Sequence, residues 1–372
     1  MTAGRHSLSD IPHAETGHDV SSAEMISMRQ RKAFFGLVFT LLALLAVSSC
    51  LPKSPMESRG GINITLYGFS IMKESLEKEI IPAFSAKWKS EHGVDVRFTS
   101  SFAGSETITN QILQGVKAQV GIFSIDRDAQ RLKDKGFVTS DWHALPQKGI
   151  INKTPFVILV RKGNPKGIHD FADLAKPGIK LIHPDPISSG GAQWSILAIY
   201  GSELVKSEQQ SLEPDRVRAL QNLQAIWRNV FSTPASAREA RTTFELGNGD
   251  ALITYELDAL LMKQSNAGAD AEIVIPESTI FSEHPVVVID RNVSSGDRAV
   301  IDAFVNYLFT EEAQRAFVKF HFRSSTNDAL NQENKELATI KYPFTVDYFG
   351  GWQRAYPEII ESIFRDQVQK RK

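Results

Sequence analysis

Apolar residues along this chain follow two alternating spacings, one typical of strands and the other typical of helices. Short runs rich in β-branched and aromatic residues at 62–67, 94–98 and 120–125 predict strands. Between these runs, 74–88 and 106–114 repeat apolar residues every three or four positions, which predicts helices. Strand, helix and strand in this order imply right-handed crossovers and a parallel sheet, in which ligands bind beyond the carboxyl ends of the strands.

The same alternation continues through the rest of the chain. The apolar run 156–160, closed by the turn 162–165, predicts a strand that carries the chain into a second lobe. The elements expected after it are strands at 179–182, 251–254, 273–275 and 286–289, and helices at 216–230 and 298–308. The resulting α/β fold has a first lobe at 62–152 and 275–350, a second lobe at 153–274, and a C-terminal helix at 351–372.

Residues 1–49 have the composition of an export signal with an extended leader. The basic cluster Arg29, Arg31 and Lys32 precedes the apolar run 33–47, which small residues follow. This order is typical of a bacterial signal peptide. The run is shorter than the roughly twenty residues that span a bilayer, although an uncleaved anchor is the alternative.

Cys50 is the only cysteine of the chain, which excludes an intramolecular disulfide. The segment Val47-Ser48-Ser49-Cys50 resembles the lipobox of bacterial lipoproteins, which implies that Cys50 is diacylated and becomes the mature N-terminus. Residues 50–61, which contain two prolines and two glycines, are then expected to form a lipidated tether. Met25 or Met28 could be the true start of translation.

The charge of the chain is nearly balanced, with 42 Lys and Arg against 43 Asp and Glu and a formal net charge of −1. Removal of residues 1–49 leaves this balance unchanged. A balanced chain without a basic block argues against nucleic acid as a partner. The apolar content of 42% is sufficient for the cores of two lobes.

The segment Ser188-Ser189-Gly190-Gly191-Ala192-Gln193-Trp194 lies directly before a helical apolar run. The first turn of a helix carries unpaired N–H groups and a partial positive charge, and glycines allow an anion to approach the backbone. Because the segment contains no lysine or arginine, it favours a small, fully ionised oxyanion over a nucleotide. An ordinary serine cap in a glycine-rich loop is the alternative.

Several motifs together resemble the sulfate- and thiosulfate-binding proteins of bacterial ABC importers. They occur in the same order as in that family, and they are Val160 to Gly167, Lys176-Pro177-Gly178, Ser188 to Trp194, Ser236-Ala237-Arg238 and Phe349 to Trp352. The resemblance implies the two-lobed periplasmic binding protein fold of type II, with mostly parallel sheets flanked by helices. It also implies a tetrahedral dianion held in the cleft between the lobes and an ABC permease as partner.

The resemblance also assigns the ligand contacts. The implied anion-binding residues are Ser105, Ser189, Gly190, Gly191, Ala237 and Tyr255. Ser105 would offer its hydroxyl and backbone N–H, and Ser189 its hydroxyl, whereas the glycines and Ala237 would offer backbone N–H groups. Tyr255 stands where the family has a tryptophan, so that a phenol, which can donate and accept, replaces an indole N–H.

Two further positions depart from the family. After Ser70 the family has a Tyr-Asp-Pro-Thr-Arg run, whereas this chain continues Ile71-Met72-Lys73. Glu106 stands where relatives have glycine. We expect Glu106 to face solvent, because an acid in the first turn of a helix is favoured by the helix dipole. The alternative is that Glu106 accepts a proton from a ligand such as hydrogen phosphate.

The sequence contains no motif that is typical of an enzyme active site. The G-x-S-x-G elbow of hydrolases is missing, since Ile187 stands two residues before Ser189. The histidines show no metal-binding spacing, so neither a metal nor a cofactor is expected. We therefore expect a monomeric, lipid-anchored receptor on the periplasmic or cell-surface side of a bacterial membrane, with sulfate or thiosulfate as ligand. A receptor for phosphate or molybdate, or an anion sensor without a transport role, is the alternative.

Overall fold

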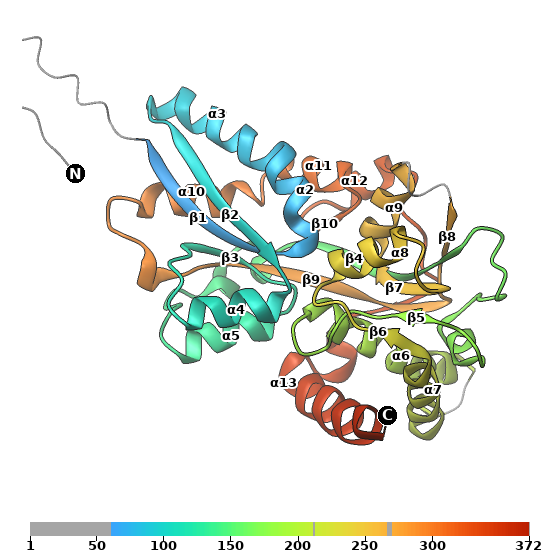
Figure 1. Ribbon diagram of the computed structural model, residues 1–372. Coiled ribbons are helices and arrows are strands. Elements are labelled where there is room, and N and C mark those ends of the chain that lie inside the picture. Colours follow the sequence, from blue (N-terminus) through green and yellow to red (C-terminus); the bar gives the residue numbers. More distant parts are fainter. Residues whose placement is uncertain (1–60, 211–212, 266–269, 372) are drawn as a thin grey trace, which may run out of the picture. The chain divides into compact units, whose positions relative to one another are not determined.

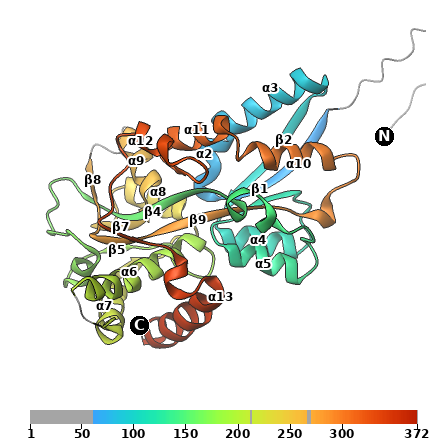
Figure 2. The same ribbon diagram turned by 180° about the vertical axis from the view of Figure 1, so that it is seen from behind.

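Strands and helices alternate through the part of the chain that the computed structural model describes, residues 61–210, 213–265 and 270–371. Cys50, the export signal and most of the tether predicted above lie outside these residues. The strands pair along one path in the order β2-β1-β3-β9-β4-β7-β5-β6 (Figures 1 and 2). The expected mixed α/β architecture is therefore confirmed.

The first part of the path is parallel, as the sequence predicted. Strand β1 (Ile62–Phe69) pairs in parallel with β2 (Val96–Ala103) and with β3 (Val120–Ile122). Helices α4 (Ser105–Leu113) and α5 (Asp126–Asp134) lie together beside these strands (Figure 1). On the other side, α3 (Ile81–His92) and α10 (Arg298–Tyr307) share an aromatic cluster with β2. The rings of this cluster belong to Phe84, Phe98 and Phe304.

The last part of the path carries the helix that follows the serine and glycine segment. Strand β5 (Leu181–Ile182) is parallel to both β6 (Val230–Ser232) and β7 (Ala251–Tyr255). Helices α6 (Gly190–Gln209) and α7 (Arg216–Asn229) lie together near α13 (Trp352–Ala355), while α8 (Ala237–Glu245) and α9 (Glu256–Gln264) lie on the other face (Figures 1 and 2). Nearly every side chain of α6 is buried.

Two long strands connect these parts. Strand β4 (Ile150–Arg161) pairs with β9 (Ser278–Val288) along 150–155, and with β7 and with β8 (Ala271–Val274) along 156–161. Both strands are longer than predicted, because they contain buried polar residues that interrupt the apolar pattern. Asn152 and His284 are such residues, and they hydrogen-bond to each other between Oδ1 and Nδ1 at 2.6 Å.

Besides short 3-10 helices, the described residues contain seven further elements. They are α2 (Lys73–Ser75), a π-helical segment (Leu76–Ile80), α11 (Glu311–Lys319), β10 (Arg323–Ser324), α12 (Asp328–Glu333), β11 (Tyr342–Phe344) and a π-helix (Tyr356–Val368) after α13. One boundary was wrong: the strand predicted at 94–98 continues to Ala103 as β2. The reason is that the backbone of residues 99–103 pairs with β1, whereas Thr99, Ser100 and Ser101 interrupt the apolar pattern that marks a strand in the sequence.

Candidate anion-binding site

Three of the described helices, α4, α6 and α8, begin beside one another. Gly104, which precedes α4, packs against the carbonyl groups of Ser188 and Ala235, which lie just before α6 and α8. A Cβ atom at position 104 would lie 2.9 Å from the Ala235 oxygen and nearer still to that of Ser188, so only glycine permits this approach. The first N–H groups of a helix have no partner within it. Three such groups of donors therefore meet in one place.

The start of α6 is built from Ser189, Gly190 and Gly191, as the sequence predicted. Ser189 is the N-cap residue and is 2% exposed, yet its side chain makes no capping hydrogen bond. A Cβ atom at Gly190 would lie 2.8 Å from Cβ of Ser124, and one at Gly191 would lie 2.8 Å from the Tyr255 hydroxyl. Both glycines are therefore required by close packing, and the Ser189 hydroxyl keeps its capacity to donate.

Ser105 opens α4 and is buried. Its hydroxyl donates to Oδ2 of Asp128 at 2.5 Å and accepts from the backbone N–H of Ser124 at 3.0 Å. Burial, together with the negative charge of Glu106, raises the pKa of Asp128 to about 8. Because the hydroxyl of Ser105 is engaged by Asp128, the backbone N–H is the donor that Ser105 still has to offer in this arrangement.

Tyr255 ends β7 and is completely buried. Its ring lies 4.5 Å from that of Phe156 and 5.9 Å from that of His284, which fixes its direction. Its hydroxyl lies 2.9 Å from Oγ of Ser124, and either oxygen could donate. Burial raises the pKa of the phenol above its usual range, so the hydroxyl keeps its hydrogen at neutral pH.

Ala237 is the first residue of α8 and is buried. The hydroxyl of Ser236 accepts from the backbone N–H of Glu239 at 3.2 Å and so caps this helix. The next side chain, Arg238, forms an ion pair with Glu74 near the end of α2. The structure thus places Ala237 at the helix start that lies beside Gly104.

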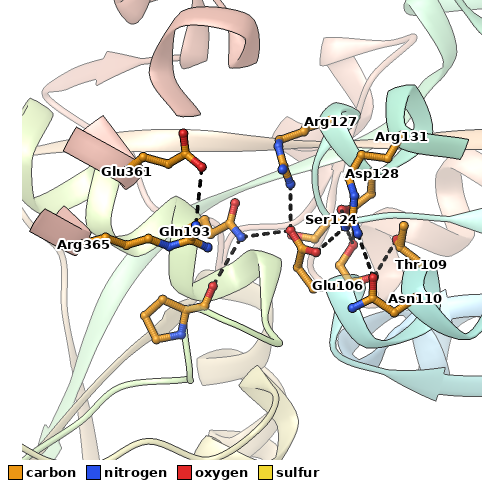
Figure 3. Close-up of polar contacts among 12 residues, drawn as sticks. Glu106, Thr109, Asn110, Ser124, Arg127, Asp128, Arg131, Gln193, Glu361 and Arg365 are labelled. Atoms are coloured by element: carbon orange, nitrogen blue, oxygen red, sulfur yellow. Dashed lines mark hydrogen bonds and ion pairs between the residues drawn. The ribbon is translucent and has the colours of Figure 1, made fainter. Parts of the chain in front are cut away.

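Glu106 does not face solvent, and this expectation was wrong. Its side chain is only 9% exposed and forms ion pairs with Arg131 and, at 3.0 Å, with Arg127 (Figure 3). Its Oε1 also accepts from Nε2 of Gln193 on α6 at 3.2 Å. The physical reason is that α5 packs against α4 and brings two arginines to the carboxylate, which the local sequence around Glu106 cannot reveal.

The structure also shows site residues that sequence reasoning missed, namely Ser124, Asp128 and Gln193. Ser124 lies just beyond β3, at the strand edge where ligands bind in parallel sheets, and this was a usable signal. Trp194, quoted in the sequence motif, donates from Nε1 to the Ser124 carbonyl at 2.7 Å and so fixes this residue. Nothing in the sequence indicated that Asp128 would accept from Ser105.

Two further observations concern the described residues only. They contain no group of three or more histidine, cysteine, aspartate or glutamate side chains placed to hold a metal ion. Within the same ranges, no helix has the length and apolar character needed to cross a membrane.

Comparison of the fold places the chain in the class of periplasmic solute-binding proteins. The solved structure of the sulfate-binding protein SubI from Mycobacterium tuberculosis has a TM-score of 0.71, with 30% identity over 80% of this chain and 99% of the other. The chain is also 34% identical to the sulfate-binding protein of Salmonella typhimurium, over 91% of this chain and 99% of the relative. The thiosulfate-binding protein of Escherichia coli is 32% identical over 76% and 82% of the two chains.

The sequence pattern of the bacterial extracellular solute-binding proteins matches residues 64–323. The chain therefore belongs to this family, within the group of sulfate- and thiosulfate-binding proteins.

Proposed function

We propose that this protein is the extracytoplasmic solute-binding component of an ABC importer and that it captures sulfate or thiosulfate. The observation that carries the proposal is the meeting of the starts of α4, α6 and α8. Their first turns are uncharged apart from Glu106, Arg238 and Glu239. Each of these side chains already has a partner in the protein: Glu106 pairs with arginines of α5, Arg238 pairs with Glu74, and Oε2 of Glu239 accepts from a backbone N–H at 3.1 Å. Neutral donors at helix starts suit a fully ionised oxyanion.

The ligand contacts in this proposal are the hydroxyl of Ser189 and the backbone N–H groups of Ser105, Gly190, Gly191 and Ala237, together with the hydroxyl of Tyr255. The short approach between Tyr255 and Gly191 supports this assignment, since it brings a side-chain hydroxyl to the first turn of α6. Catalysis has no part in the proposed function, and no cofactor is needed for it.

The proposed lobes are 62–152 with 275–350, and 153–274. Three contacts, two of them buried, support a closed arrangement of the lobes, because each joins a residue of one lobe to a residue of the other. They are Glu74 with Arg238, Glu106 with Gln193, and Ser124 with Tyr255. A ligand that contacts both lobes would stabilise this arrangement through its greater affinity for the closed form. The permease that receives the ligand, the monomeric state and the lipid anchor on Cys50 belong to the same proposal.

Calorimetric titration of the purified protein with sulfate and with thiosulfate tests the proposal. We expect saturable binding of at least one anion by the wild type. Gly191→Ala should weaken that binding at least about tenfold, because its Cβ atom would lie 2.8 Å from the Tyr255 hydroxyl and displace it. Gly296→Ala is the matched control, since its nearest neighbour would be 3.7 Å away. A wild type that binds neither anion would contradict the proposed function.

A further inference from the structure

The hydroxyls of Ser124 and Tyr255 form an isolated pair inside the candidate site. The two oxygens are 2.9 Å apart, and their residues are 1% and 0% exposed. Among the described residues, neither hydroxyl makes any other hydrogen bond. One hydrogen is shared within the pair, which leaves a second hydrogen and several lone pairs without partners in a buried place. Buried polar groups in proteins are normally satisfied, so this unused capacity points to a ligand.

Both oxygens lie against the first turn of α6. A Cβ atom at Gly190 would be 2.9 Å from Oγ of Ser124, and one at Gly191 would be 2.8 Å from Oη of Tyr255. The pair therefore lies beside the first backbone N–H groups of α6, close to the Ser189 hydroxyl. A ligand held by these donors would also meet the hydroxyl pair.

The positions of both hydroxyls are fixed by their surroundings. The backbone of Ser124 donates to Oγ of Ser105 and accepts from Nε1 of Trp194 at 2.7 Å. The ring of Tyr255 is held against Phe156 and His284. The pair can therefore exchange the roles of donor and acceptor by rotating two hydrogens, without moving any heavy atom.

We propose that the Ser124 and Tyr255 pair determines the ligand range of the site, and that it admits tetrahedral oxyanions carrying one hydrogen, such as hydrogen phosphate, alongside fully ionised ones. This inference rests on the proposed function. A single donor such as an indole N–H would oppose a ligand O–H group with another hydrogen. The hydroxyl pair can donate its free hydrogen to one ligand oxygen while its other oxygen accepts from the ligand O–H.

The chemistry distinguishes the two kinds of ligand. A fully ionised anion needs only the free hydrogen of the pair, which either hydroxyl alone could supply. A singly protonated anion needs a donor and an acceptor at the same time, and the pair supplies them from two separate oxygens, each facing a different ligand oxygen. Removal of one hydroxyl should therefore weaken the binding of hydrogen phosphate more than the binding of sulfate.

The test is calorimetric titration with sulfate, selenate and inorganic phosphate at about pH 8, where phosphate is mainly the hydrogen phosphate dianion. We expect the wild type to bind phosphate measurably. In Ser124→Ala, the ratio of the phosphate Kd to the sulfate Kd should rise by about tenfold, because the ligand O–H loses its acceptor. The double variant Ser124→Ala with Tyr255→Trp, which offers one donor only, should show the same rise or a larger one.

Selenate is the control for size, because it is larger than sulfate but carries no hydrogen at this pH. A loss of selenate binding equal to that of phosphate in Ser124→Ala would overturn the proposal, since size and not the hydrogen would be the cause. An unchanged ratio in Ser124→Ala, or a wild type that binds sulfate but no phosphate, would also overturn it. A wild type that binds none of the three anions would instead contradict the proposed function. The Ser124→Ala change is small, so its result stands even if the double variant does not fold.

Discussion

Ser189 is a buried residue whose side chain has no capping role, and we propose a ligand-binding role for it instead. It occupies the N-cap position of α6, where a serine usually accepts from a backbone N–H, yet its side chain makes no such bond. A buried hydroxyl that does not cap its helix contributes little to the stability of that helix. The proposed ligand instead explains why this buried hydroxyl is left free to donate.

We therefore expect Ser189→Ala to weaken sulfate binding by about 1 to 3 kcal/mol, because a hydrogen bond to a charged ligand is lost. The free energy of unfolding without ligand should change by much less. Calorimetric titration and denaturant unfolding measure the two quantities. Equal sulfate affinity in variant and wild type would remove Ser189 from the site. Ser236→Ala is a useful comparison, since that hydroxyl does cap its helix and its loss should cost stability, by about 1 kcal/mol.

At the scale of elements, the packing of α4 against α5 depends on a compact charge cluster. Glu106 on α4 pairs with Arg127 and Arg131 on α5 and accepts from Gln193 on α6 (Figure 3). Three helices thus share one carboxylate. The arginines are about a quarter exposed, so the cluster is only partly shielded from water.

We predict that Glu106→Gln destabilises the protein by about 2 to 4 kcal/mol, because two arginines and an amide lose their common partner in a partly buried place. Urea unfolding of wild type and variant provides the measurement. Glu311→Gln serves as the control, since the pair of Glu311 with Arg315 is at least half exposed and should contribute less than about 1 kcal/mol. Equal losses in the two variants would show that the cluster adds nothing beyond a surface pair.

Two completely buried histidines, which lie on or beside strands, make the stability of the protein depend on pH. Burial lowers the pKa of His183, just after β5, to about 4, and that of His284, on β9, to about 3. An unfolded histidine has a pKa of about 6.5. Because the folded pKa values are lower, the unfolded state binds more protons below about pH 6.5, and stability is lost as the pH falls from there towards 4.

The expected slope is about 1.4 kcal/mol per pH unit for each of the two histidines. Denaturant unfolding at several pH values between about 4 and 7 measures it. His183→Gln should reduce the slope by about 1.4 kcal/mol per pH unit, the contribution of one proton. A slope that does not depend on His183 would contradict this interpretation.

At the scale of the whole molecule, the spacing of apolar residues predicted most elements. Each half-buried strand or helix repeats its apolar residues with a period that can be seen in the local sequence. The same patterning could not predict the full lengths of β4 and β9, where Asn152 and His284 satisfy each other across the strands. Within the site, glycine and serine motifs indicated the start of α6. The roles of Asp128 and Glu106 were not predictable, because their partners lie 23 and 21 to 87 positions away in the sequence.

The lipid anchor remains a prediction about the whole molecule. Cys50→Ser should release the protein from the membrane or block its processing, because the acylated thiol would be its anchor. Fractionation of cells expressing the full chain, followed by detection of the protein in membrane and soluble fractions, gives the result. Normal processing with retention in the membrane would refute the lipobox interpretation.

The continuity of β4 and β9 has a consequence for how the molecule unfolds. Strand β9 pairs with β3 of the first part and with β4, and β4 pairs further along its length with β7 and β8. The two strands therefore join both parts of the path through continuous backbone hydrogen bonds. The protein should therefore melt as one cooperative unit despite its size. Scanning calorimetry should give a calorimetric enthalpy equal to the van't Hoff enthalpy, whereas two separable transitions would indicate that the proposed lobes unfold independently.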